Sequence, residues 1–118
     1  MKKTIKLILS PEAKEVYFYL NENASKSKID NSILNAINNK VEIIKINSHY
    51  GNPIQKDRIP NEYIIKYNIK NLFRVELPNY WRMLYTLTNN DSEVHIIAFV
   101  LDIINHKEYN KKFGYKNK

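Results

Sequence analysis

The sequence predicts a single α+β domain spanning residues 1–118, from three observations. In the first half of the chain, apolar residues recur at the spacing of an amphipathic helix. In the second half, the pattern changes to a two-residue alternation rich in β-branched and aromatic residues, which is typical of strands. A chain of 118 residues, 43% of them hydrophobic, has room for one core. The predicted order is an N-terminal strand, a two-helix hairpin, an antiparallel three-stranded meander and a short basic C-terminal segment.

The N-terminal half is expected to supply the first strand and both helices. Alternation in residues 3–9 suits a short strand of mixed exposure. Ser10 is a favourable N-cap, and Pro11 suits the first position of a helix, so the first helix should begin there. A break over residues 21–27 separates it from a second helical stripe over residues 29–44.

The C-terminal half is expected to form the meander. Residues 52–60 contain two prolines and are predicted to be an ordered loop rather than a helix or strand. Strands are predicted around residues 72–77 and 81–87, with a turn over 88–92. Residues 94–104 are almost continuously apolar, which predicts a strand covered on both faces.

The net charge of +7 comes from 19 Lys and Arg against 12 Asp and Glu. Residues 106–118 hold five lysines and one glutamate, a local excess of four, and are expected to be helical or loosely ordered. Such a basic surface favours phosphate-bearing or acidic partners. The alternative is that the charge only keeps the domain in solution.

Composition excludes several classes of protein. Without cysteine, the chain has no disulfide framework, thiol nucleophile or cysteine-based zinc site. Gly51 and Gly114 are the two glycines and lie far apart, which argues against a phosphate-binding loop or a dinucleotide fold. The apolar run over residues 96–101 is closed by Asp102 and is too short to cross a bilayer. We therefore expect a soluble, cytoplasmic protein without a membrane partner.

Alternation predicts a cluster of charge on one face of the meander. Arg74 and Glu76 are two residues apart on one strand, and Arg82 follows after a short connection, so all three can share a face. A guanidinium is suited to clamp a scissile phosphate, and Arg82 is the expected clamp, with Arg74 assisting. The alternatives are a structural ion pair between Arg74 and Glu76, and stacking of Arg82 over Trp81 or Tyr80.

The C-terminal segment adds two further candidates. His106 could be a general acid or base, since imidazole changes protonation state near neutral pH. Tyr109 would lie on the same side of a helix and could stack on a base or donate a proton. The alternatives are an ordinary surface histidine and an apolar patch of Tyr109, Phe113 and Tyr115 that docks the segment on the sheet.

Three stretches, 71–77, 80–85 and 106–109, resemble the strand, the arginine strand and the terminal motif of the RelE/ParE superfamily of toxins. RelE-type toxins are small ribonucleases that cut mRNA, usually on the ribosome, and are held inactive by a cognate antitoxin. The resemblance implies the toxin of a type II toxin–antitoxin system, an mRNA interferase whose partners are mRNA, the ribosome and an antitoxin protein. It also implies cleavage without a metal or organic cofactor.

The resemblance assigns roles to the five candidates. Arg82 resembles the arginine of the family's second meander strand, Arg74 a basic strand residue, Tyr109 the C-terminal tyrosine and His106 the residue that precedes it. Glu76 departs from RelE itself, which has a lysine there, and is similar to the glutamate base of other family nucleases, so the base is Glu76 or His106. Residues expected to hold the RNA backbone are Lys56, Arg58, Lys107, Lys111 and Lys112.

Two other functions remain open at this point. ParE relatives share the fold but poison gyrase and cut nothing. A non-catalytic RNA-binding relative would keep the charge without cleavage.

Overall fold

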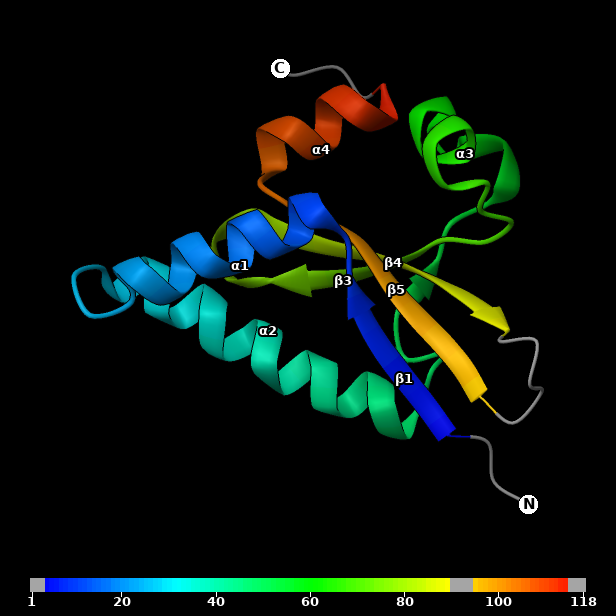
Figure 1. The fold of residues 1–118 in the computed structure, drawn as a ribbon. Coiled ribbons are helices and arrows are strands. Elements are labelled where there is room, and N and C mark those ends of the chain that lie inside the picture. The colour runs from blue at the N-terminus through cyan, green and yellow to red at the C-terminus, as the bar shows by residue number, and fades with distance from the viewer. Residues whose placement is uncertain (1–3, 90–94, 115–118) are drawn as a thin grey trace.

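The computed structural model describes residues 4–89 and 95–114, which form a mixed sheet with helices on both faces (Figure 1). Within these ranges the sheet has five strands in the order β1-β5-β4-β3-β2. The strands are β1 (Thr4–Leu9), β2 (Asn52–Pro53), β3 (Phe73–Leu77), β4 (Trp81–Asn89) and β5 (His95–Ile104). The four α-helices of the same ranges are α1 (Pro11–Asn23), α2 (Lys28–Ile46), α3 (Asn61–Tyr67) and α4 (His106–Phe113). The predicted α+β class is confirmed.

Strand pairing reproduces the predicted meander and extends it on both sides. β3 pairs with β4 and β4 with β5, both antiparallel, and Glu76 stands opposite Arg82. β1 adds to the far side of β5 in parallel, and β2 pairs with β3 through two residues. The parallel pair is what makes the sheet mixed.

The predicted helical hairpin is present as α1–α2, and it covers one face of the sheet. The Ser10 hydroxyl accepts a hydrogen bond from the Ala13 backbone N–H (3.0 Å) and donates one to the Leu101 carbonyl (2.6 Å). It therefore caps α1 and ties the helix to β5 at once. The buried residues of this face include Leu20, Ile33, Ile37, Ile44, Val75, Met83, Tyr85, Val100 and Ile103.

The opposite face is covered by α3 and α4 near the end of the sheet where β5 leads into α4 (Figure 1). Leu84 and Tyr85 are adjacent on β4 and both are fully buried, each in a different core. The described part of β5 likewise contributes Val100 to one core and Leu101 to the other, so its predicted burial on both faces is confirmed. The second core consists of Ile59, Tyr63, Ile69, Leu72, Leu84, Leu101, Ile104 and Tyr109.

The structure differs from the prediction over residues 52–67. The segment 52–60 was predicted to be a loop without helix or strand, which is wrong, because it contains β2 and a 3₁₀ turn at Lys56–Arg58. No helix was predicted over Asn61–Tyr67, where the structure forms α3. That helix is fixed by distant partners, since the Tyr63 hydroxyl donates to Asp102 (2.8 Å).

The turn predicted over residues 88–92 lies only partly within the described residues. Residues 88 and 89 belong to β4 instead, and residues 90–92 lie outside the described residues. No helix in the described ranges is both long and apolar enough to cross a membrane.

Candidate active site

The five predicted site residues meet on the face of the sheet that α4 covers. Arg74 and Glu76 come from β3, Arg82 from the start of β4, and His106 and Tyr109 from the first two turns of α4. The alternation along β3 turns Phe73, Val75 and Leu77 into the α1–α2 core, which leaves the charged residues on the other face.

Arg82 is the centre of this cluster. Its Nη1 atom lies 2.7 Å from the Tyr80 carbonyl oxygen and 3.1 Å from His106 Nδ1, and a guanidinium nitrogen of this kind carries two hydrogens to donate. Its guanidinium carbon lies 4.7 Å from the centre of the Tyr109 ring. The alternative prediction that Arg82 stacks over an aromatic ring is thus correct, but the ring is that of Tyr109 rather than Trp81 or Tyr80. Only 13% of the Arg82 side chain is exposed.

Glu76 lies between the two guanidinium groups. Its Oε1 is 3.0 Å from Arg74 Nε and its Oε2 is 3.5 Å from Arg82 Nε. The side chain is 53% exposed, so solvent screens both ion pairs and each contributes about 0–1 kcal/mol to stability. The carboxylate is held in place while one side of it faces solvent.

Arg74 borders two hollows at the surface. One, of about 240 Å³, is also lined by Arg58 and Tyr109. The other, of about 290 Å³, is also lined by Lys40 and Glu76. Arg74 is 32% exposed, more than twice as much as Arg82. Of the two arginines, Arg74 is therefore the better placed to meet a phosphate that enters from solvent.

Tyr109 is a buried part of the cluster. It is 3% exposed, with Arg82 at one side of its ring and the Phe113 ring stacked at 4.3 Å. This packing realises the predicted apolar patch for Tyr109 and Phe113, while Tyr115 lies outside the described residues. The ring has no open face for a nucleobase. Its hydroxyl accepts a hydrogen bond from Arg74 Nη1 (3.0 Å), which ties α4 to β3.

His106 is held at both ring nitrogens. It opens α4 directly after the cap Asn105, whose side chain accepts from the Glu108 backbone N–H (2.9 Å). Arg82 has only donors, so His106 Nδ1 must be the acceptor in their contact, and a neutral ring then carries its proton on Nε2. Nε2 lies 3.1 Å from the side-chain nitrogen of Asn110, Nδ2, and a proton on Nε2 finds an acceptor there when that amide is turned by 180° to present its oxygen.

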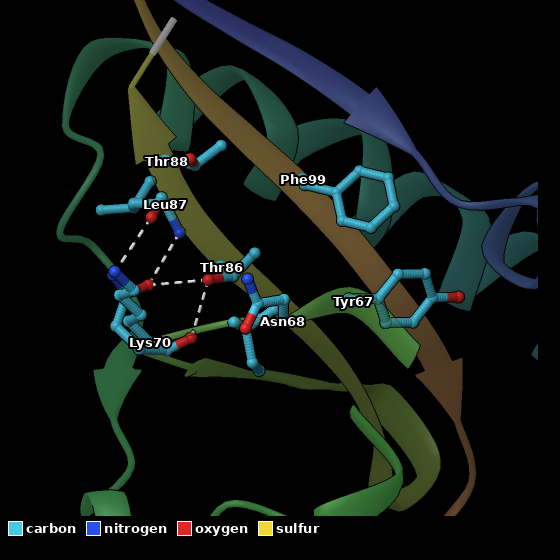
Figure 2. A pocket seen from close by; sticks show the side chains of 9 residues that line it. Tyr67, Asn68, Lys70, Thr86, Leu87, Thr88 and Phe99 are labelled. Atoms are coloured by element: carbon cyan, nitrogen blue, oxygen red, sulfur yellow. Dashed lines mark hydrogen bonds between the residues drawn. The ribbon is translucent and has the colours of Figure 1, made fainter. Parts of the chain in front are cut away.

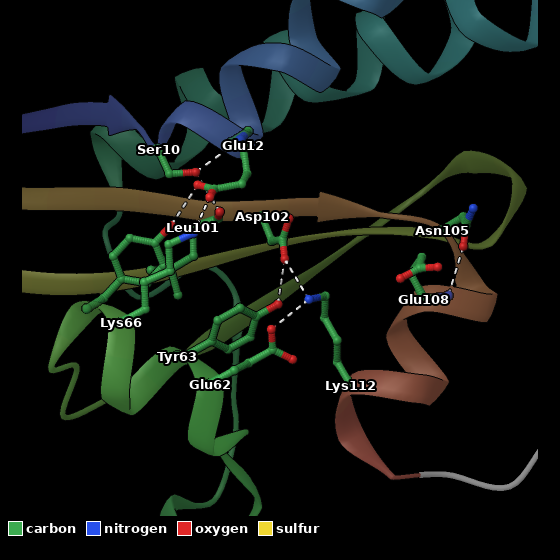
Figure 3. Close-up of polar contacts among 12 residues, drawn as sticks. Ser10, Glu12, Glu62, Tyr63, Lys66, Leu101, Asp102, Asn105, Glu108 and Lys112 are labelled. Carbon is green, nitrogen blue, oxygen red and sulfur yellow. Dashed lines mark hydrogen bonds and ion pairs between the residues drawn. The ribbon is translucent and has the colours of Figure 1, made fainter.

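The five predicted RNA-backbone residues divide into two groups. Lys56, Arg58, Lys107 and Lys111 are exposed, and Arg58 shares a hollow with Arg74. Lys112 lies outside the cluster, because its amine forms ion pairs with Glu62 (2.9 Å) and Asp102 (3.7 Å), as Figure 3 shows.

The contacts of Lys112 belong to a polar network that joins α3 to the rest of the protein (Figure 3). Burial raises the pKa of Asp102, although the hydrogen bond from Tyr63 and the charge of Lys112 oppose it. At the other end, a hydrogen bond from Lys66 holds the pKa of Glu12 at about 2. Each charged group here has a partner within the chain, so the network is structural.

A hollow of about 580 Å³ lies apart from the predicted residues, on the sheet face beyond α3 (Figure 2). Tyr67 and Phe99 border one side of it. On the other side, Asn71 accepts from the Leu87 backbone N–H (2.8 Å) and donates to the Leu87 carbonyl (3.1 Å). These polar groups of Asn71 and Leu87 bind one another, and none of the five predicted site residues lines the hollow.

Sequence reasoning overlooked one feature of the cluster, the exposed ring of Tyr80 in the turn between β3 and β4. Asn79 and Tyr80 are consecutive non-glycine residues with positive φ, 58° and 62°. The Tyr80 ring is 74% exposed and its centroid lies 5.9 Å from that of His106. An aromatic residue between a Pro-Asn turn and the strand that carries Arg82 was the signal available in the sequence.

The described ranges contain no group of three or more His, Cys, Asp or Glu side chains that could hold a metal ion. Comparisons of the chain with protein-family models, curated proteins and solved structures find no match.

Proposed function

We propose that the protein is a RelE-like toxin of a type II toxin–antitoxin system, an endoribonuclease that cleaves mRNA on the ribosome. The observation that supports this best is the meeting of Arg74, Glu76, Arg82, His106 and Tyr109 on one face of the sheet. Motif resemblance selected these residues from separate stretches of the sequence. The proposal includes the RelE-type arrangement of the fold and inhibition by a cognate antitoxin.

The cluster contains the groups that cleavage without a metal requires. The RNA 2′-oxygen attacks the adjacent phosphorus, its proton passes to a base, and the bond from phosphorus to the 5′-oxygen breaks as that oxygen is protonated. The products are a 2′,3′-cyclic phosphate and a free 5′-hydroxyl. Glu76 is our choice of base, because its carboxylate is exposed and can only accept when ionised.

The remaining groups divide the other tasks. Arg74 binds the phosphate and stabilises the charge that develops on it, since it borders the two hollows. Arg82 positions His106 and Tyr109 through its contacts with both. His106 supplies the proton to the leaving oxygen from Nε2, after that nitrogen leaves Asn110.

The test is cleavage of a translated mRNA by the purified protein, with and without ribosomes, followed by mapping of the new RNA ends. Glu76→Gln removes the base but keeps its size, and should lower the rate roughly 10²- to 10⁴-fold. Glu42→Gln is the matched control, because Glu42 is also an exposed carboxylate ion-paired to a cation, Lys45 (3.2 Å), but lies on α2. Intact mRNA in every reaction of the wild-type protein would refute the proposal.

A second candidate is RNA binding without cleavage. It is favoured by the internal contacts of Arg82 and by the engagement of both ring nitrogens of His106, which leave fewer groups ready for chemistry. Binding that weakens steeply with salt while the RNA stays intact would support this function. Inhibition of gyrase supercoiling without nucleolysis would instead support the ParE-like alternative.

A further inference from the structure

We propose that Tyr80 forms a nucleobase-binding subsite beside the cluster, on which one base of a single-stranded RNA stacks. The inference rests on the proposed function and names how that site would hold its substrate. It starts from the exposed ring in the turn between β3 and β4, at residues 78–80.

The location of the ring ties it to the cluster. Its centroid lies 5.9 Å from that of His106, with the two ring planes inclined at 54°. The carbonyl oxygen of the same residue accepts the 2.7 Å hydrogen bond from Arg82. A base stacked on Tyr80 would therefore belong to a nucleotide next to the phosphate that the cluster holds.

The backbone of the turn points to a role for the side chain. Left-handed φ is unfavourable for a bulky residue, and glycine would adopt it without strain. Here the conformation is held by the contact of Arg82 with the Tyr80 carbonyl and by a hydrogen bond from the Trp81 N–H to the Pro78 carbonyl. Strain of this kind collects at binding and catalytic sites, where the surroundings maintain it. The result is an aromatic ring turned out to solvent at the edge of a charged cluster.

The chemistry of the ring fits RNA. Single-stranded RNA is recognised largely by bases that stack on aromatic side chains, and such stacking tolerates different bases because every base has a π-face. Tyr109 cannot serve in this way, since Arg82 and Phe113 occupy its ring. Tyr80 offers the open aromatic surface that Tyr109 lacks.

The test is binding of a fluorescently labelled, single-stranded RNA oligonucleotide with 2′-O-methyl groups, which prevent cleavage. Tyr80→Asn removes the ring and keeps a residue that tolerates left-handed φ, so the turn is preserved. It should weaken binding about 5- to 150-fold, the effect of losing one stacked base. Tyr80→Phe keeps the ring and should bind within about twofold of the wild type. Phe18→Asn, which removes an exposed ring from α1, is the matched control and should bind like the wild type.

Oligonucleotides with one base removed identify the contact itself. For the wild type, one abasic position should weaken binding as much as Tyr80→Asn does, and the variant should be indifferent to that same position. Equal affinity of wild type and Tyr80→Asn for the intact oligonucleotide would overturn the subsite while leaving the proposed function in place. Failure of the wild type to bind or cut any RNA would overturn both.

Discussion

The hydroxyl of Tyr85 should account for a large part of the stability of the segment that leads into β2. Tyr85 is fully buried, donates a hydrogen bond to the Ser48 carbonyl (2.7 Å) and accepts one from the Gly51 N–H (2.9 Å). Tyr85→Phe keeps the ring stacked on Phe73, at 5.1 Å between centroids, but leaves two buried backbone groups without this partner. At about 1–3 kcal/mol for each of the two stranded groups, we expect a loss of about 2–6 kcal/mol.

Thermal and urea unfolding would measure that loss. For 118 residues the entropy of unfolding is about 0.25 kcal/mol/K, so the midpoint should fall by about 8–24 °C. Tyr17→Phe is the matched control, because the Tyr17 hydroxyl donates to the exposed Asn38 side chain (2.6 Å) and water can replace it. The control should lose less than about 1 kcal/mol. If Tyr85→Phe cost no more than Tyr17→Phe, the reasoning from buried backbone groups would be wrong.

Three further outcomes are expected in unfolding experiments. Gly51→Ala should destabilise by about 1–3 kcal/mol, because the added Cβ would lie 2.9 Å from Tyr85 Cε1; an unchanged urea midpoint would contradict this. The pKa of Glu12 is lowered from 4.5 to about 2 by Lys66, so its stabilisation is present above pH 4.5 and is lost as pH falls toward 2. Acid titration of Glu12→Gln should therefore show a flatter loss of stability over that window than the wild type. Burial raises the pKa of Asp102 above 3.8, so ionisation of this carboxyl opposes folding as pH rises. In urea unfolding, Asp102→Asn should therefore be more stable than the wild type at pH 7 and should lose that advantage at pH 3.

The parts of the fold that follow local rules could be predicted from the sequence. Ser10 followed by Pro11 located the start of α1. The period-two pattern located β3 and β4 and indicated which of their side chains alternate toward the core. The antiparallel order of β3, β4 and β5 followed from their short connections. Each of these features depends on residues that are neighbours in sequence.

The short helix α3 could not be predicted in this way. Ile64 and Ile65 resemble strand residues, yet both are exposed, so their apolar character does not mark a buried face. No side chain caps the helix at Pro60. The helix is held in place by hydrogen bonds from Tyr63 to Asp102 and from Tyr67 to Glu12, whose partners are 39 and 55 residues away in the sequence. A local window contains none of these contacts.

In the candidate site, too, the features set by sequence neighbours could be predicted and those set by distant contacts could not. That Arg74, Glu76 and Arg82 share a face followed from alternation, and the ion pairs between them agree with it. The docking of α4 on the sheet was only one of two alternatives, because it depends on the second core, which a local pattern does not show. The sequence therefore favoured Arg82 as the clamp and left Tyr109 available for stacking, whereas the structure buries Tyr109 and leaves only 13% of the Arg82 side chain exposed.

The pairing of β1 with β5 has a consequence for the order in which the protein can assemble. Ser10, at the end of β1, bonds to Leu101, which the ribosome adds 91 residues later. During synthesis the first strand must therefore wait, with its edge unpaired, until nearly all described elements have been made. Contacts between such distant segments slow folding. Because β4 also pairs with β5, and α4 comes later still, the cluster around Arg82 can be completed only after both β5 and α4 have been made. A nascent chain would thus lack the assembled site until its synthesis has passed α4.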